Sequence, residues 1–263
     1  MGIDHIIDLE CVPKQTLSTE GILVRLKARE RAATILKLFR DNGDERPPSE
    51  MGFEMVRRMS DGTEETQVVI VQDLLDNAAQ LDPLSKHCVD CPANRTRQPF
   101  GCFGYINYPI SRAAELWLLK QLPGPQEPLS FLLLNRTMRD FALSGEQVSA
   151  MRANTGVFFE TDQRFSKNLE DTQITTDHVF EMLFLSGSIK PAHAALLLIF
   201  FGGIPRDMDA NILMALTQPG GDRSVPFLAN PEAEEDQSIR ALKGFLRALY
   251  IAFQLNVTVS LDV

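Results

Sequence analysis

The sequence lacks any apolar stretch long enough to cross a membrane. Its longest apolar run, residues 192–203, spans about twelve residues, whereas a transmembrane helix needs about 20. The first residues also lack the basic region followed by an apolar segment that marks a secretory signal peptide. We therefore expect a cytoplasmic protein with no membrane span, in which residues 192–203 form a buried helix.

The short motifs of common catalytic chemistry are also missing. The chain contains no Gly-x-Ser-x-Gly nucleophile elbow and no His-Glu-x-x-His zinc-protease motif. Its paired glycines do not stand between a strand and a helix, as a phosphate-binding loop requires. These absences leave no residue to which catalysis can be assigned, and they leave open whether the chain is an enzyme.

Positive charge is scarce relative to negative charge. The chain has 26 lysines and arginines against 35 aspartates and glutamates, which gives a net charge of −9. This charge disfavours broad contact with nucleic acid or with an anionic membrane. Hydrophobic residues make up 44% and charged residues 23%, which is the usual composition of a globular protein. A chain of 263 residues can bury a core without the help of disulfides.

Cysteine is rare, yet three of the four cysteines fall within fifteen residues. Cys88 and Cys91 are separated by two residues, and Cys102 follows a segment that contains two prolines. Two thiolates at this spacing can hold one tetrahedral zinc ion, and a third can approach from the following loop. The sequence therefore predicts a zinc site at Cys88, Cys91 and Cys102. Its fourth ligand would be Cys11 or, alternatively, His87.

Other chemistry is open to the same cysteines. An iron–sulfur cluster also takes cysteine ligands, although ten residues separate Cys91 from Cys102, more than in ferredoxin loops. An open coordination position would make a metalloenzyme, because a metal can activate bound water. A redox pair of Cys88 and Cys91 would need a helix after it to stabilise the thiolate. Pro92 and Pro99 indicate a loop there instead.

The cysteine segment is locally basic and aromatic, because no acidic residue occurs between Asp90 and Glu115. Arg95, Arg97 and Tyr105 could therefore contact phosphates and stack on bases, as zinc knuckles do with single-stranded nucleic acid. A few cations on an acidic protein are a small electrostatic footprint. Nucleic-acid binding is thus the weaker alternative, and solvated arginines beside core aromatics are the stronger one.

Hydrophobic periodicity predicts an α+β fold: a small mixed or antiparallel sheet that includes the N- and C-terminal strands, and a mostly helical second half. Strands are predicted at residues 3–12, 53–56, 66–71 and 255–263, the middle two as a hairpin. Helices are predicted at residues 19–39, 71–84, 129–141, 145–152, 177–185 and 190–201, and after the capping residues Ser111 and Asn230.

Prolines suggest where the chain divides. Three prolines and a glycine lie between residues 121 and 128, and neither a regular helix nor a strand tolerates such a cluster. We predict an α/β subdomain at residues 1–122 that carries the cysteine segment and a mainly helical subdomain at residues 129–254. The C-terminal strand, residues 255–263, would return to the sheet.

These observations favour a zinc-braced cytoplasmic protein that acts as a binding or regulatory component, with a protein or a small ligand as its partner. One competing hypothesis is a metalloenzyme or redox protein that uses the same cysteines. Another places function in the helical half, where residues 190–203 would pack on a partner. That half contains the tripeptide Leu-Ser-Gly twice, at residues 143–145 and 185–187, which suggests a repeated helix hairpin.

Overall fold

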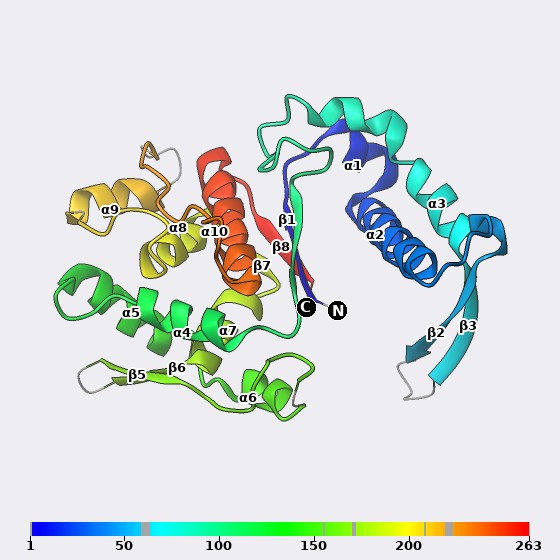
Figure 1. Cartoon of the computed structure of the whole chain (residues 1–263). Coiled ribbons are helices and arrows are strands. Elements are labelled where there is room, and N and C mark those ends of the chain that lie inside the picture. The colour runs from blue at the N-terminus through cyan, green and yellow to red at the C-terminus, as the bar shows by residue number, and fades with distance from the viewer. Residues whose placement is uncertain are drawn as a thin grey trace. The chain divides into compact units, whose positions relative to one another are not determined.

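The computed structural model describes residues 2–58, 64–154, 156–169, 172–207, 209–218 and 223–262. These residues form an α+β fold with a small antiparallel sheet that includes the N- and C-terminal strands, as predicted (Figure 1). The chain divides into two compact units. We refer to Met1–Leu9, Pro92–Arg97 and Gly101–Val263 as the sheet unit, and to Glu10–Cys91 and Gln98–Phe100 as the hairpin unit.

A four-stranded antiparallel sheet with the order β4-β1-β8-β7 organises the sheet unit. Its strands are β4 (Phe103–Asn107), β1 (Gly2–Ile7), β8 (Val259–Asp262) and β7 (Ser188–Ile189). In β1, Ile6 is opposite Phe103 on one side and Ser260 on the other. The prediction that the C-terminal strand returns to the N-terminal one is therefore confirmed.

The first strand is shorter than predicted. It ends at Ile7, and helix α1 (Val12–Leu17) follows with Pro13 in its first turn, a position where proline favours the start of a helix. Cys11 is the N-cap residue of α1 and has an extended backbone. The predicted strand over residues 3–12 is therefore wrong beyond Ile7, and Cys11 does not belong to the sheet.

The last helix, α10 (Gln237–Leu255), begins later than predicted. Its N-cap residue is Asp236 and not Asn230, because the Asp236 carboxylate accepts hydrogen bonds from the backbone N–H groups of Ser238 and Ile239. Both residue types are good caps, so the choice depends on tertiary contacts. Along α10, a buried stripe is formed by Leu242, Leu246, Leu249 and Phe253.

The C-terminal strand is also shorter than the predicted range of residues 255–263. Helix α10 runs to Leu255, and Asn256 ends it in the left-handed conformation, with φ of 57°. Asparagine tolerates this conformation better than most residues. β8 therefore starts only at Val259, and Val263 lies outside the described residues.

The other regular elements of the sheet unit lie between β4 and α10. A two-stranded antiparallel hairpin joins β5 to β6. These elements are α4 (Arg112–Gln121), α5 (Pro128–Asp140), α6 (Glu146–Arg152), β5 (Ser166–Leu169), β6 (Thr172–Thr175), α7 (Thr176–Phe184), α8 (Pro191–Phe200) and α9 (Ala210–Thr217). The helices on both sides of the proline cluster, α4 and α5, belong to the same compact unit.

Helix α8 is the apolar run that the sequence predicts to be a buried helix, and this prediction is confirmed. Most of its residues are buried, and it packs against α10, which contacts β1 and β4 in turn (Figure 1). The largest fully buried side chains of this core come from α7, α8 and α10 and from the residue after α8: Phe184, Phe200, Phe201, Phe245 and Phe253.

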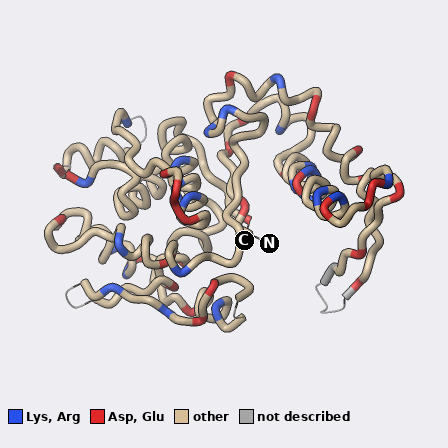
Figure 2. Tube along the Cα trace, in the orientation of Figure 1, with Lys and Arg blue, Asp and Glu red and all other residues tan. Residues whose placement is uncertain are grey.

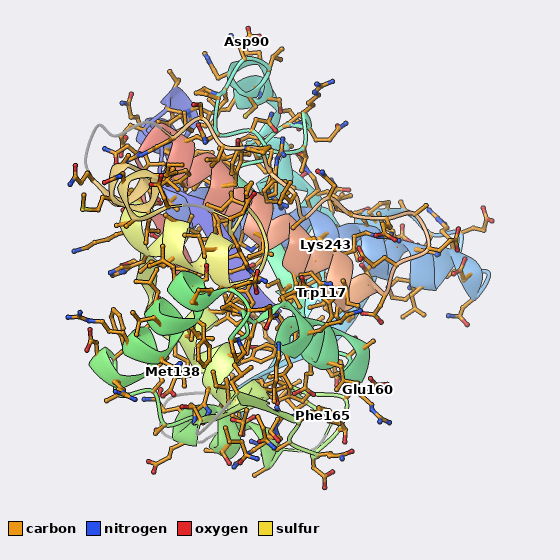
Figure 3. The ribbon with its side chains drawn as sticks, turned by 90° about the vertical axis from the view of Figure 1, so that its left-hand side faces the viewer. Asp90, Trp117, Met138, Glu160, Phe165 and Lys243 are labelled. Carbon is orange, nitrogen blue, oxygen red and sulfur yellow. The ribbon has the colours of Figure 1, made fainter. Side chains whose placement is uncertain are left out.

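The N-terminal ends of α4 and α10 are joined by their capping residues. Ser111 caps α4, as predicted, because its hydroxyl accepts a hydrogen bond from the backbone N–H of Ala114. The same hydroxyl donates to the Asp236 carboxylate of α10 at 2.7 Å. Further along, the Lys243 ammonium of α10 lies 5.8 Å from the ring centroid of Trp117 in α4, within reach of a cation–π contact (Figure 3).

The hairpin unit contains the long helix α2 (Thr19–Asp41) and the antiparallel pair β2 (Gly52–Arg58) and β3 (Glu64–Ile70). The predicted hairpin is confirmed. The predicted helix at residues 71–84 is instead two elements. Helix α3 (Val71–Ala79) is followed by the 3₁₀ helix η2 (Asp82–Cys88), which has Pro83 at its start. A shorter 3₁₀ helix, η1 (Pro48–Glu50), precedes β2.

One buried cluster of the hairpin unit lies between α2 and α3. Ala32 of α2, Met51 and Val71 of α3 are fully buried, and partly buried side chains of α2 and α3 pack around them. The exposed surface of α2 carries lysines, arginines and acidic residues in mixed order (Figure 2). Interspersed charges of both signs are typical of a solvated helix face.

Within the described ranges, no helix combines the length and apolar character that crossing a membrane requires.

Candidate functional site

Three of the four predicted zinc ligands belong to the hairpin unit. Cys11 is the residue before α1, Cys88 ends η2, and Cys91 lies in the turn that follows, where its backbone N–H reaches the carbonyl oxygen of Cys88 at 3.5 Å. Helix α1 contacts η2, which brings Cys11 towards the other two. Cys102, by contrast, belongs to the sheet unit.

The pKa of the Cys88 thiol is affected by Cys91 and Cys11. Burial raises its pKa, and the charges that Cys91 and Cys11 would carry as thiolates raise it further. The backbone N–H of Phe100 acts in the opposite direction, because a hydrogen bond to sulfur stabilises the thiolate. The three thiols are therefore close enough to interact electrostatically.

The thiol positions do not by themselves form a metal site. In the described part of the chain, no group of three or more histidine, cysteine or acidic side chains is arranged so that it could hold a metal ion. All four cysteines lie in that part, and none is in a disulfide. His87, the alternative fourth ligand, is exposed on η2.

The three residues predicted to contact nucleic acid differ in how far they are exposed to solvent. Arg97 and Tyr105 are exposed, but Arg95 is partly buried, and its Nη2 donates to the carbonyl oxygen of Phe103 at 2.9 Å. A Cβ atom on Gly104 would collide with the guanidinium of Arg95, which shows how closely this side chain packs on β4. Arg95 is thus turned into the sheet unit and not towards solvent.

His5 lies against the same guanidinium. Its side chain is 1% exposed, and neither ring nitrogen has a hydrogen-bond partner among the described residues. Burial lowers the pKa of His5 to about 3, and the charge of Arg95 contributes to this shift. The ring packs edge-on against Phe245 of α10, with 5.2 Å between centroids. His5 is therefore a neutral core residue at physiological pH.

A pocket lies among the helices of the sheet unit. It encloses about 270 Å³, and α5, α6, α7, β7 and α8 contribute to its walls, together with the turns after α5 and α7. The part of α5 that reaches it is marked in Figure 3 by Met138, the neighbour of the lining residue Thr137. Most of the lining is apolar, notably Met182, Leu185, Ile189, Leu196, Leu197 and Phe200.

A few polar side chains interrupt this apolar lining. Glu181 of α7 uses Oε2 to accept a hydrogen bond of 2.6 Å from the backbone N–H of Gly145. His193 of α8 also lines the pocket, and its ring packs edge-on against the exposed Phe141, with 5.7 Å between centroids. Gln147 contributes an amide. The pocket thus has the usual chemistry of a small-ligand site, an apolar body with few polar groups.

Both Leu-Ser-Gly tripeptides contribute to this pocket. Leu143 and Leu185 each line it, and the glycine that ends each tripeptide has a positive φ, 71° at Gly145 and 67° at Gly187. Glycine adopts this conformation without the strain that a Cβ would bring. The repeated tripeptide is therefore a sequence signal for this pocket, although each of its leucines resembles a core residue.

Comparison of the chain with models of known protein families, with curated proteins and with solved structures finds no match. The chemistry of the pocket and of the cysteine segment is therefore the basis for a functional proposal.

Proposed function

We propose that this protein is a binding component whose ligand is a small, mostly apolar molecule held in the pocket of the sheet unit. The proposal is supported by a pocket of about 270 Å³ with an apolar lining and a few polar groups. Ligand sites in proteins are typically concave and mostly apolar, with volumes from about 300 Å³ upward. The pocket lies just below that range, so the ligand is compact.

Titration with 2-phenylethanol, a neutral probe with one aromatic ring, tests this proposal. The probe should bind to the wild-type protein, because the ring exchanges water for apolar surface. Leu196→Trp should weaken binding by at least about tenfold, since the indole fills space that the ring needs and each 1.4 kcal/mol is a factor of ten. Isothermal titration calorimetry measures both affinities.

Leu132→Trp is the matched control. Leu132 lies on α5, is 64% exposed and is not part of the pocket lining, so this variant should bind the probe like the wild type. Circular dichroism checks that both tryptophan variants fold. Equal affinity of the Leu196→Trp variant and the wild type, or no binding to either, would contradict the proposal.

A second proposal concerns zinc at the cysteines, as a brace in the same binding protein. It is supported by the electrostatic interaction of Cys88 with Cys91 and Cys11 and by the N–H group of Phe100 at the Cys88 sulfur. Zinc-bound thiolates carry negative charge, and N–H donors around a metal site stabilise its ligands. His87, which precedes Cys88 in the same 3₁₀ helix, would supply the fourth bond. Reduced thiols are required, which suits a cytoplasmic location.

Elemental analysis of protein purified without added metal tests the zinc proposal. We expect about one zinc per chain. Cys88→Ser and Cys91→Ser should lower both zinc content and unfolding stability, because metal binding is coupled to folding. Val89→Ala is the control, since Val89 lies between these cysteines and is 74% exposed. Folded protein without metal would contradict the proposal, and iron in place of zinc would favour the cluster alternative.

A further inference from the structure

The pocket contains an acidic group that lacks a cationic partner. Of the described residues that line the pocket, Glu181 alone is acidic. Its Oε2 accepts the hydrogen bond from Gly145. Across the described ranges, no lysine or arginine forms an ion pair with Glu181. The second carboxylate oxygen is therefore available to a ligand.

The surroundings of Glu181 favour a positive group over a negative one. The residue lies in the second half of α7 (Thr176–Phe184), and the C-terminal end of a helix carries partial negative charge. Glu181 is partly buried, and a carboxylate forms its strongest hydrogen bonds with donors that also carry positive charge. A ligand carboxylate at the same place would be repelled.

We infer that the ligand of this pocket is a small apolar molecule that carries an ammonium or similar cationic donor, and that Glu181 binds this group. The inference rests on the proposed function, because it requires that the pocket binds a ligand. The apolar body lies against the wall formed by α8, which includes Leu197 and Phe200. Glu181 then selects among apolar molecules of equal size by the charge of their polar end.

Three probes with the same aromatic body separate charge from shape: 2-phenylethylamine, 2-phenylethanol and phenylacetate. At pH 8 the amine is protonated, the alcohol neutral and the acid ionised, whereas histidine side chains are ordinarily neutral. The titrations are made in 0.15 M salt, which screens the overall negative charge of the protein. The amine should bind at least about tenfold more tightly than the alcohol, as expected for a hydrogen bond to a charged group, and phenylacetate should bind most weakly.

Glu181→Gln tests the residue itself. The glutamine carbonyl can still accept the Gly145 hydrogen bond, so the turn is retained while the charge is removed. In this variant the amine should lose its preference and bind no more tightly than the alcohol, whose affinity should stay within about twofold of the wild type. Glu146→Gln is the control, because Glu146 is exposed on α6 and does not line the pocket. It should keep the full preference.

The outcomes distinguish the inference from the proposed function. If the alcohol binds and the amine binds no better, the inference is overturned while the pocket remains a binding site. If the amine preference persists in Glu181→Gln, the inference is likewise overturned, because the positive group is then held elsewhere. If none of the three probes binds, both the inference and the proposed function fail.

Discussion

Replacing Arg152 with methionine should lower the free energy of unfolding by about 3–5 kcal/mol. The Arg152 guanidinium is 4% exposed and lies between two buried carboxylates, with Nη2 at 2.6 Å from Glu115 and at 2.7 Å from Asp177. It also packs on the ring of Phe159, 4.0 Å from the centroid. Methionine fills part of the space but leaves the buried Glu115 without its cation and Asp177 with Arg164 alone.

A surface ion pair provides the control for this large effect. Arg136 and Asp140 on α5 form an ion pair at 3.1 Å, with side chains that are 76% and 59% exposed. Arg136→Met should change the unfolding free energy by no more than about 0.5 kcal/mol, because exposed pairs are solvated in both states. Urea unfolding measures both variants. A structural role for this network would be contradicted if Arg152→Met and the control differed by less than about 1 kcal/mol, which is the contribution of one ordinary hydrogen bond.

Acidification should destabilise the protein through His5. Burial first, and the charge of Arg95 second, lower the pKa of His5 in the folded state to about 3, whereas an unfolded histidine has a pKa near 6.5. Between these values the unfolded chain binds more protons, so stability rises with pH. The contribution is therefore fully present above about pH 6.5 and is lost as the pH falls towards 3, at about 1.4 kcal/mol per pH unit.

The His5→Leu variant isolates this contribution. Glu115 acts in the opposite direction, because burial raises its pKa in spite of the hydrogen bonds from Arg152, so the wild-type curve alone does not report on His5. Between pH 6.5 and 4.5 the wild type should lose about 2–3 kcal/mol more than His5→Leu. Urea unfolding across this range gives the difference. Parallel curves for the two proteins would show that His5 is protonated as easily in the folded state as in the unfolded one.

Local signals predicted much of the fold. Ser111 can be predicted as a cap because its hydroxyl has only to reach the first turn of its own helix, α4. Alternation of apolar and polar residues predicts the hairpin of β2 and β3 and the final strand, because this pattern involves only residues that are neighbours in the sequence. The sequence alone predicts the wrong start for α10, because Asn230 and Asp236 are both good caps. Asp236 also forms a hydrogen bond with Ser111 on a distant segment, and the local pattern does not show this contact.

The buried ion pairs and the candidate sites depend on contacts that the sequence does not show. Arg152 pairs with Glu115, 37 positions away, and no local pattern marks either residue as buried. The pocket is lined by residues between Thr137 and Phe200, and its leucines have the pattern of a filled core. Whether such side chains meet or leave a cavity depends on how the helices pack. The cysteine spacing, in turn, could not tell that Cys102 belongs to a different compact unit from Cys88.

The most direct test of ligand binding in the pocket is a methyl NMR titration of the full chain with 2-phenylethanol. Met182, Leu185 and Ile189 line the pocket, so we predict that their methyl signals shift in a saturable way. Val56 and Val68, which are exposed on the hairpin of the other unit, should not respond. Unchanged pocket signals at probe concentrations that shift those valines would contradict the central claim that this pocket is a binding site.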